Sequence, residues 1–313
     1  MDQNSKFKVA VNCMTYNHAE YIEDALNGFK IQETSFPVAY LVVDDASSDK
    51  EPEILYKWAL DNLENDNRES LWKDKTYGKL AVAPLKGKSN SLFVIALLSE
   101  NHYRKGISWK KSEYIAEWIG NAEYRAMCEG DDYWTDLNKL EKQVEYLDAH
   151  KDVNICVHNA EVFLCETGER IPFNNGINDG IYDIKDVVRM KWFTPTASFV
   201  YRNNFELLPI WISSGCNGDM AILYSNLLKG KLYYDSEIKS VYRYGTPSSF
   251  SASFNEKQLV RKKLNLYKTI NRVSHYKYIL YIAPQALKLR IMQTTAFKWV
   301  NDIRLRMREK LTK

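Results

Sequence analysis

The sequence has no long hydrophobic run and no apolar leader. Its most apolar window, residues 276–286, is far shorter than the roughly 20 residues of a membrane-spanning helix, and it contains Lys277 and Pro284. Residues 1–8 are polar and lead directly into a short apolar stretch, so the apolar core of a secretory signal is missing. We therefore expect a cytoplasmic protein.

Cysteine and histidine lack the spacing of a metal site. The cysteines are an odd number without Cys-x-x-Cys pairs, namely Cys13, Cys128, Cys156, Cys165 and Cys216. This pattern is typical of reduced, mostly buried thiols and argues against disulfides or a zinc site. Glycine-rich phosphate loops of the GxGxxG or GxxxxGK[ST] type are also missing. The charge of a bound phosphate would therefore have to be neutralised by a metal.

An excess of one charge is missing from the chain as a whole. The 313 residues include 43 Lys and Arg against 40 Asp and Glu, and 45% are hydrophobic. Such a composition is globular, and the near-balance argues against a dedicated nucleic-acid-binding protein. The sum hides an asymmetry, because residues 257–313 carry a net charge of +13 and residues 1–256 a net charge of −10.

Strand and helix patterns alternate in the first half of the chain. Buried strands are predicted for the apolar runs at residues 7–13, 38–43 and 124–128. Helical spacing is found at residues 21–29, 51–62 and 114–122, the last of these after a short strand at 80–83 and a polar stretch. This alternation predicts a mostly parallel sheet with both faces covered.

Each of the three apolar runs ends on a polar cluster. The clusters are Thr15-Tyr16-Asn17-His18, Asp44-Asp45-Ala46-Ser47-Ser48-Asp49 and Glu129-Gly130-Asp131-Asp132. In parallel sheets, ligands bind outside the carboxyl ends of the strands. The sequence therefore predicts a ligand site built from these clusters.

The third cluster has the chemistry of a divalent metal site. Glu129, Asp131 and Asp132 repel one another unless a cation or solvent accepts them, and Mg²⁺ or Mn²⁺ takes such oxygen ligands together with substrate phosphates. The alternative is a solvated acidic turn that caps a helix beginning near Asp136. The buried strand before the cluster and the aromatic pair after it favour the metal.

The first two clusters permit nucleoside binding. A strand-end carboxylate such as Asp44 or Asp45 accepts hydrogen bonds from ribose hydroxyls or base N–H groups. The alternative, compatible with the first, is that this segment caps the following helix. Thr15 and Asn17 are equally typical of a simple turn.

Three segments together resemble the N-terminal half of family 2 glycosyltransferases, which are inverting enzymes with the GT-A fold. The matching segments are residues 9–26, 40–49 and 122–147. The resemblance is strong to about residue 165, weaker to about 250 and absent beyond. It implies an α/β fold with a Rossmann-like, mixed, mostly parallel sheet flanked by helices. The implied domain spans residues 1–256, with a donor half at 1–150, an acceptor half at 151–256 and a basic helical extension at 257–313.

The resemblance also implies the substrates and the site. It points to a nucleotide-sugar donor, most often a UDP-sugar, a Mn²⁺ or Mg²⁺ cofactor, and a glycan or lipid-linked acceptor in bacterial polysaccharide or glycoconjugate synthesis. The implied donor-binding residues are Thr15, Tyr16, Asn17, Asp44, Asp45, Asn101, Asp131 and Arg243. The Glu129–Asp132 turn resembles the family's Asp-x-Asp metal motif, with Asp131 at the position that meets the metal-bound diphosphate.

Inverting transfer needs a base for the acceptor hydroxyl. Residues 217–222 resemble the family segment that opens an acceptor-side helix, which implies Asp219 as that base, with Asp235 and Glu237 as weaker rivals. The alternative for Asp219 is an N-cap of a helix at 220–228.

One position departs from the family pattern. Gly245 stands where members often carry the histidine of Tyr-Arg-x-His, so Arg243 or a lid formed by residues 246–249 would have to substitute. Aromatic residues at 192–193 and Trp211 suit an acceptor sugar, but core packing is favoured.

The basic segment interleaves apolar and cationic residues over two or three predicted helices. Such helices lie on anionic membrane surfaces, here the inner face of the cell membrane. The alternatives are a helical cap on the acidic domain, an oligomer contact or solvated basic faces. For the whole protein, the rival functions are a sugar-phosphate nucleotidyltransferase and a non-catalytic nucleotide- or glycan-binding protein.

Overall fold

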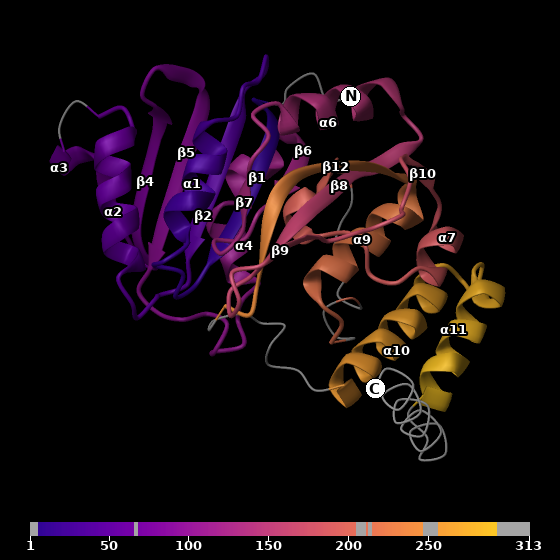
Figure 1. The fold of residues 1–313 in the computed structure, drawn as a ribbon. Coiled ribbons are helices and arrows are strands. Elements are labelled where there is room, and N and C mark those ends of the chain that lie inside the picture. Colours follow the sequence, from indigo (N-terminus) through magenta and orange to yellow (C-terminus); the bar gives the residue numbers. More distant parts are fainter. Residues whose placement is uncertain (1–5, 66–67, 205–210, 212–214, 247–255, 293–313) are drawn as a thin grey trace. The chain divides into compact units, whose positions relative to one another are not determined.

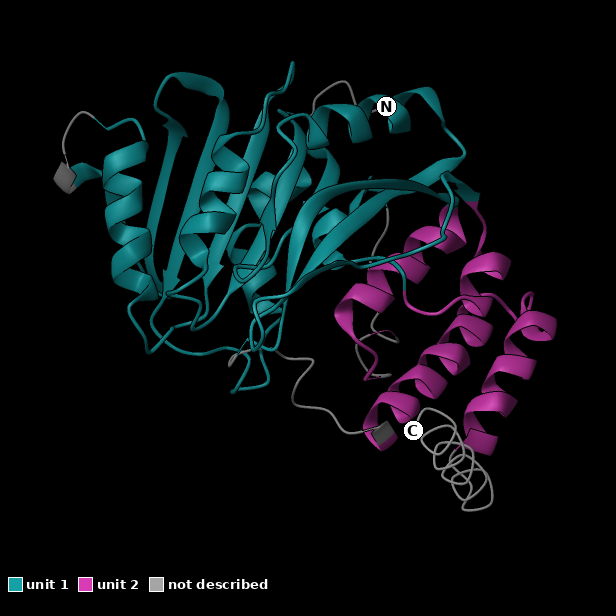
Figure 2. Cartoon of the chain, viewed as in Figure 1, with its two compact units in different colours: residues 1–181, 193–205, 230–249 teal, residues 182–192, 206–229, 250–313 magenta. Residues whose placement is uncertain are grey.

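The computed structural model describes residues 6–65, 68–204, 211, 215–246 and 256–292. The chain divides into two compact units, coloured separately in Figure 2. The first unit comprises Met1–Ile181, Phe193–Phe205 and Gly230–Ser249, and the second comprises Tyr182–Trp192, Glu206–Lys229 and Phe250–Lys313. Segments of the predicted acceptor half, including the helix that carries Asp219, therefore group with the basic extension.

The first unit is built on a mixed sheet whose centre is parallel (Figure 1). The central strands are β1 (Phe7–Thr15), β2 (Val38–Asp44), β5 (Lys88–Leu98) and β6 (Ala122–Met127). Strand β1 pairs in parallel with β2 and β6, and β2 pairs in parallel with β5. The predicted α/β fold with a mostly parallel core is confirmed.

Further strands extend this centre on both sides, beginning with the antiparallel neighbours of β6 and β5. The further strands are β3 (Trp72–Lys75), β4 (Gly78–Leu85), β7 (Tyr133–Trp134), β8 (Val153–Leu164), β9 (Arg170–Pro172), β10 (Gly180–Tyr182), β11 (Val200–Arg202) and β12 (Lys231–Tyr244). The sheet order is β10-β12-β8-β11-β6-β1-β2-β5-β4-β3. Strand β12 pairs in parallel with β8 and antiparallel with β7, which brings it next to the turn between β6 and β7.

Helices cover both faces of this sheet. They are α1 (Ile22–Lys30), α2 (Glu51–Asn62), α3 (Arg68–Leu71), α4 (Lys110–Tyr114), α5 (Ala116–Gly120) and α6 (Lys139–Ala149). Alternate residues of β2 enter two different hydrophobic clusters: Tyr40 packs with Phe29 of α1, whereas Leu41 belongs to the cluster that includes Ile115. Burial on both faces explains why β2 is apolar at every position up to Asp44 rather than alternating.

The sequence patterns missed β5 and misjudged two helices. Strand β5 was predicted as a polar stretch because it begins with Lys88 and Asn90, but these side chains bond backbone carbonyls of residues 30–36. The helix predicted at 114–122 is split into α4 and α5 and ends before β6. The helix expected near Asp136 begins at Lys139.

The second unit is helical in its described part. Its helices are α7 (Ile184–Arg189), α9 (Gly218–Lys229), α10 (Glu256–Val273) and α11 (Ile279–Met292). A capping box fixes the start of α7, because Asp183 accepts from the Asp186 amide while the Asp186 carboxylate accepts from the Asp183 amide. Among the described helices, none has the length and apolar character needed to cross a membrane.

Buried side chains include several that the sequence analysis assigned to packing. Phe193 and Trp211 are 2% and 1% exposed, as expected for core residues. All five cysteines are free thiols; Cys13, Cys128 and Cys156 are buried, whereas Cys165 and Cys216 are partly exposed.

Candidate functional site

The three polar clusters meet at the carboxyl edge of the central strands. Thr15 at the end of β1 stands in register with Asp44 at the end of β2. The amide of Gly130 donates to the Met14 carbonyl at 3.3 Å, which holds the turn after β6 against the end of β1. Parallel pairing thus places the clusters side by side, as the sequence analysis predicted.

Reciprocal hydrogen bonds join the loops after β1 and β2. The Asn17 amide donates to Ser47 Oγ, and the Ser48 amide donates to Asn17 Oδ1, both at 2.8 Å. Asn17 and Ala46 both have φ of 57°, the left-handed region that tight turns need. The polar side chain of Asn17 tolerates this backbone because it bonds the neighbouring loop.

Glu51, the first residue of α2, is hydrogen-bonded to both of these loops, and the sequence analysis did not predict this role. Its fully buried carboxylate accepts from the Thr15 hydroxyl, from the His18 amide at 2.8 Å and from Ser47 Oγ at 2.9 Å. Since the Thr15 proton points to Glu51, His18 Nδ1 donates to Thr15 Oγ1 at 3.0 Å. A single acidic residue at a predicted helix start is usually interpreted as a helix cap. Only the three-dimensional contacts show that Glu51 also holds the two loops.

Asp44 is a buried carboxyl with one nearby loop partner. It accepts from the amide and the hydroxyl of Ser47. Burial raises the pKa of Asp44 to about 7, against the lowering influence of the Ser47 hydrogen bonds and with a further raising effect from Glu51. Near neutral pH this group therefore exists in both protonation states and can accept or donate a hydrogen bond.

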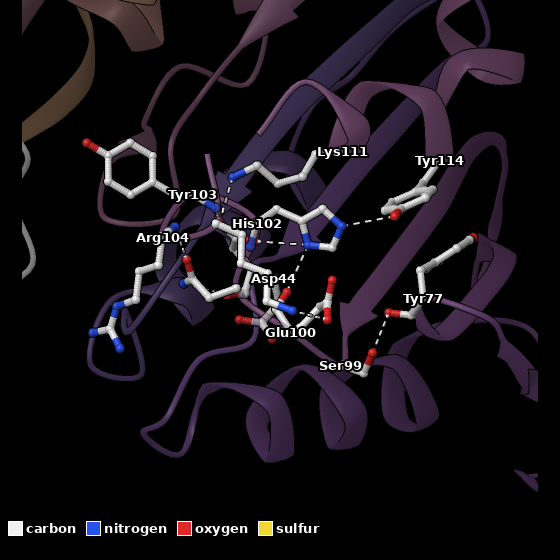
Figure 3. A network of polar contacts seen from close by, with 12 residues as sticks. Asp44, Tyr77, Ser99, Glu100, His102, Tyr103, Arg104, Lys111 and Tyr114 are labelled. Atoms are coloured by element: carbon white, nitrogen blue, oxygen red, sulfur yellow. Dashed lines mark hydrogen bonds and ion pairs between the residues drawn. The ribbon is translucent and has the colours of Figure 1, made fainter. Parts of the chain in front are cut away.

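Asp45 anchors the loop that follows β5, whose residues His102 and Tyr103 are labelled in Figure 3. Its carboxylate accepts from the amides of His102 at 2.7 Å and Tyr103 at 3.1 Å and pairs with Lys111 at 2.9 Å. Asn101 donates to the Asp45 carbonyl at 2.8 Å. The two predicted donor-binding residues, Asp45 and Asn101, thus bond each other's segments and shape the rim of the site.

The loop after β5 places a cation over an aromatic ring of the loop after β1. The Arg104 guanidinium lies 5.5 Å from the ring centre of Tyr16, and Arg104 is exposed. The two ring nitrogens of His102 are hydrogen-bonded to the Glu100 carbonyl and to the Tyr114 hydroxyl, each at 2.9 Å. Figure 3 shows the Arg104 side chain directed away from this histidine network.

Gly130 permits the closest approach in the site. A Cβ at this position would stand 2.1 Å from Thr15 Oγ1 and 2.9 Å from His18 Nδ1. The following carboxylate, Asp131, is partly exposed, with Oδ2 3.8 Å from His18 Nε2 and 3.3 Å from the hydroxyl of Thr246. Only glycine therefore allows the Asp131 turn to lie against β1.

Asp132 is separated from its two acidic neighbours. It is 1% exposed, Oδ1 accepts from the Arg243 amide at 2.9 Å, and Oδ2 has no hydrogen-bond partner in the described part of the chain. Burial, together with repulsion by Asp131 and Glu129, raises the pKa of Asp132 well above its usual value. It faces β12 rather than solvent, and its role as a third metal ligand stays a prediction.

The turn has two carboxylates that are accessible to a metal ion, the exposed Glu129 and the partly exposed Asp131. Within residues 6–65, 68–204, 211, 215–246 and 256–292, no three His, Cys, Asp or Glu side chains converge on a metal position. Two carboxylates fit Mg²⁺ or Mn²⁺ when the oxygens of a substrate diphosphate and water complete the shell. That arrangement, rather than an all-protein cage, is compatible with this turn.

The side chain of Arg243 is hydrogen-bonded to the turn that contains Asp131. Its guanidinium donates to the Asp131 carbonyl at 2.8 Å and to the Asp24 carboxylate, between the rings of Tyr21 and Tyr133 at 4.9 and 4.6 Å. A positioning role is therefore evident, whereas direct donor contact stays a prediction. Gly245 has a φ of 85°, a conformation that would strain the family histidine. Of the predicted lid, residues 247–249 lie outside the described residues.

Asp219 belongs to the second unit and is partly exposed in the first turn of α9. It is not the N-cap, because α9 already begins at Gly218, and Oδ1 accepts from the Met220 amide at 2.7 Å. Burial raises the pKa of Asp219, against the lowering influence of Lys262. Both rivals lie in the first unit and pair with the buried Lys239: Asp235 directly and Glu237 at 3.1 Å.

Comparison with curated proteins finds relatives of part of the chain. No family model matches the chain. Uncharacterized proteins of Mycobacterium tuberculosis and Mycobacterium bovis are 30% identical over 202 residues, which is 62% of this chain and 46% of the relatives. The chain thus spans about half the length of the curated relatives that it matches.

The solved structure of TarS shares this architecture, and a second solved structure is less similar. Residues 1–349 of Staphylococcus aureus TarS, in complex with UDP-GlcNAc, superpose with a TM-score of 0.58 at 14% identity, covering 92% of this chain and 74% of that one. A mannosyltransferase of Pyrobaculum calidifontis, in complex with GDP-Man and Mn²⁺, covers 96% of this chain and 80% of that one at 12% identity, with a TM-score of 0.48. The likeness to TarS shows that the chain has a GT-A-like fold.

Proposed function

We propose that this protein transfers a sugar, with inversion, from a nucleotide-diphosphate donor to a hydroxyl of a glycan or lipid-linked acceptor. The observation that carries the proposal is the convergence of the Thr15, Asp44 and Asp131 clusters at one edge of a GT-A-like sheet. The TarS structure with the same fold contains UDP-GlcNAc, which supports a UDP-sugar as the donor here.

The nucleoside would occupy the loops after β1 and β2. Asp44, with its pKa near neutrality, would bond a base or ribose group, and Tyr16 would offer its ring face. The exposed guanidinium of Arg104, which lies over Tyr16, would attract the diphosphate. The Thr15–Glu51–Ser47 bonds keep these loops fixed before the donor arrives, which lowers the entropy cost of binding.

The diphosphate would meet the Asp131 turn. Asp131 and Glu129 would hold Mn²⁺ or Mg²⁺, and the metal would supply charge stabilisation for the leaving diphosphate. Arg243 would keep the Asp131 backbone in place through its bond to the carbonyl. His18, 3.8 Å from Asp131, would orient that carboxylate.

Asp219 would be the base that takes the proton from the acceptor hydroxyl. Its raised pKa makes it a stronger base than an ordinary surface carboxylate, which suits proton removal near neutral pH. The Met220 amide bonds one carboxylate oxygen and leaves the other for the acceptor.

The test combines donor binding with turnover. Thermal shifts and calorimetry against uridine and guanosine diphosphate sugars, with and without Mn²⁺, should reveal one nucleotide class that binds at least about tenfold more tightly with metal. Release of the nucleoside diphosphate, with oligosaccharide mixtures as acceptors, reports transfer.

Three variants separate the proposed roles. Asp131→Asn should lose the Mn²⁺-dependent part of donor binding. Asp219→Asn should keep donor affinity but lose roughly 10²–10⁴-fold in turnover, the usual contribution of a general base. Asp152→Asn, a surface carboxylate paired with Lys231, is the matched control and should change neither. Donor binding without turnover by any mixture, or full turnover of Asp219→Asn, would contradict the proposal.

A further inference from the structure

The α10–α11 pair is the most cationic part of the described chain. Residues 257–292 contain nine Lys and Arg and no Asp or Glu. The two helices lie side by side in the second unit (Figure 1). Among the described residues, Lys268, Lys288 and Arg290 have no carboxylate partner, so their charges face solvent uncompensated. A solvated helix of a globular domain normally mixes both signs, whereas the only acid of this pair is Glu256, the first residue of α10.

An apolar stripe runs along the outside of α11. Leu280, Leu287 and Ile291 are 82%, 58% and 47% exposed. Their spacings of seven and four residues put them on one face of the helix. Only Ile282 of this helix is fully buried. Large aliphatic side chains in one exposed row mark an interaction surface rather than the scattered apolar residues of ordinary surfaces.

A groove of about 260 Å³ lies between the two helices, beside this stripe. Leu264, Ile282 and Leu287 contribute its apolar lining, and Lys268 and Arg290 supply cations. The volume falls just below the roughly 300–1,000 Å³ of drug-sized ligand pockets, which favours a single thin chain over a nucleotide. An apolar slot with cationic residues matches the division of a phospholipid into acyl chain and phosphate.

Two further features of the pair point to a missing partner. Asn271 lines the groove, is nine-tenths buried and leaves Oδ1 without a hydrogen-bond partner in the described part of the chain. An unpaired buried amide is costly unless a ligand hydroxyl or water satisfies it. Burial and the nearby cation of Lys288 lower the pKa of Lys263, a repulsion that an anion between the helices would relieve.

We propose that the α10–α11 pair binds the surface of a bilayer that contains anionic phospholipid. The stripe enters the boundary between headgroups and acyl chains, the cations contact lipid phosphates, and the groove takes up one acyl chain. Charge complementarity selects an anionic bilayer over a second copy of this chain, because two such cationic faces would repel each other. The proposal does not depend on glycosyl transfer, since lipid binding is measured without donor or acceptor.

Vesicle co-sedimentation of the full chain tests the proposal. The protein should partition onto vesicles of 30% phosphatidylglycerol in phosphatidylcholine at least tenfold more strongly than onto phosphatidylcholine alone. The difference should shrink at high salt, because ions screen the lipid phosphates. Lys268→Gln combined with Lys288→Gln should lower partitioning by about fivefold for each charge removed.

The apolar stripe is tested with a matched pair of variants. Leu280→Gln combined with Leu287→Gln should lose at least tenfold in partitioning. Val82→Gln combined with Ile171→Gln changes exposed apolar residues of the first unit and should bind as the unaltered protein does. Thermal melting of each variant checks that it is folded, and exposed positions should melt almost unchanged.

Three outcomes would overturn the proposal. The first is partitioning that is equal on anionic and neutral vesicles or absent from both. The second is unaltered binding by the folded stripe variant, which would assign lipid contact to another segment. The third is concentration-dependent dimerisation in sedimentation velocity that the stripe variant abolishes, which would assign the stripe to a second copy of the chain.

Discussion

The strand-end site and the α10–α11 pair treat their charged groups in opposite ways. At the strand ends, Glu51, Asp45 and Arg243 are hydrogen-bonded to other parts of the same unit. On α10–α11, Lys268, Lys288 and Arg290 have no carboxylate partner among the described residues, and aliphatic side chains face solvent. The first region is organised before any ligand arrives, whereas the second offers its charges and apolar side chains to the external partner proposed above. Substitutions should therefore damage the first region more than the second.

The largest effect should come from Gly130→Ala. The new Cβ would overlap Thr15, whose Cβ stands only 2.6 Å away and cannot yield without moving β1. We expect a loss of about 1–3 kcal/mol or more in the free energy of unfolding, measured by urea denaturation, and loss of nucleotide-sugar binding. Gly120→Ala is the control, because no heavy atom lies within 4 Å of its Cβ position. Equal stability of the two variants would show that the Asp131 turn is not tightly held.

The next effect should come from Glu51→Gln. The amide nitrogen replaces an acceptor and faces donors, so buried hydrogen bonds from Thr15 or His18 are lost. We expect the free energy of unfolding to fall by about 1–3 kcal/mol. Glu53→Gln on the exposed face of the same helix should change it by less than about 0.5 kcal/mol. A similar result for both would mean that Glu51 does not organise the loops.

An effect that is visible only as a pH dependence should come from Asp44→Asn. Between about pH 4 and 7 the folded protein keeps the Asp44 proton that the unfolded chain has lost, because burial raises the pKa to about 7. The contribution of this group to stability is therefore present at pH 4 and lost as the pH rises through 7. Melting profiles should show the unaltered protein losing up to about 4 kcal/mol relative to Asp44→Asn across this window, because each unit of pKa shift corresponds to about 1.4 kcal/mol. Parallel profiles would indicate an ordinary, ionised Asp44.

The smallest effect should come from Leu280→Ala. This side chain is 82% exposed, so its removal should alter the free energy of unfolding by less than about 0.5 kcal/mol. Ile282→Ala, two residues away and 1% exposed, is the contrasting variant and should cost about 2–4 kcal/mol. A large loss from Leu280→Ala would place that residue in the packing of the unit and weaken its role as a surface for lipid.

Local patterns predicted the central fold well and the contacts within the site poorly. The strands at 7–13, 38–43 and 124–128 were recognisable because most of their residues are apolar, and the strand at 38–43 is buried on both faces throughout. Strand β5 escaped notice because the polar residues at its start serve carbonyls more than 50 residues away. Propensity reports a residue's immediate neighbours and carries no information about such partners.

The same limit of local sequence patterns applies to the predicted site residues. The clustering of Thr15, Asp44 and Asp131 follows from parallel pairing, which the alternation of strands and helices predicts. The inward position of Asp132 and the bond from Arg243 to Asp24 depend on β12 lying beside the β6–β7 turn. That neighbour is separated by about a hundred residues, so the sequence showed three equal carboxylates where the structure distinguishes them.

The distribution of the cysteines has a practical consequence for spectroscopy. Burial raises the pKa of the Cys13 and Cys128 thiols, which lie beneath the strand ends, so alkylating reagents will reach them only when the sheet opens. Cys165 and Cys216 are partly exposed, one in each unit. The natural chain thus supplies one attachment point per unit for a pair of dyes without any engineered cysteine.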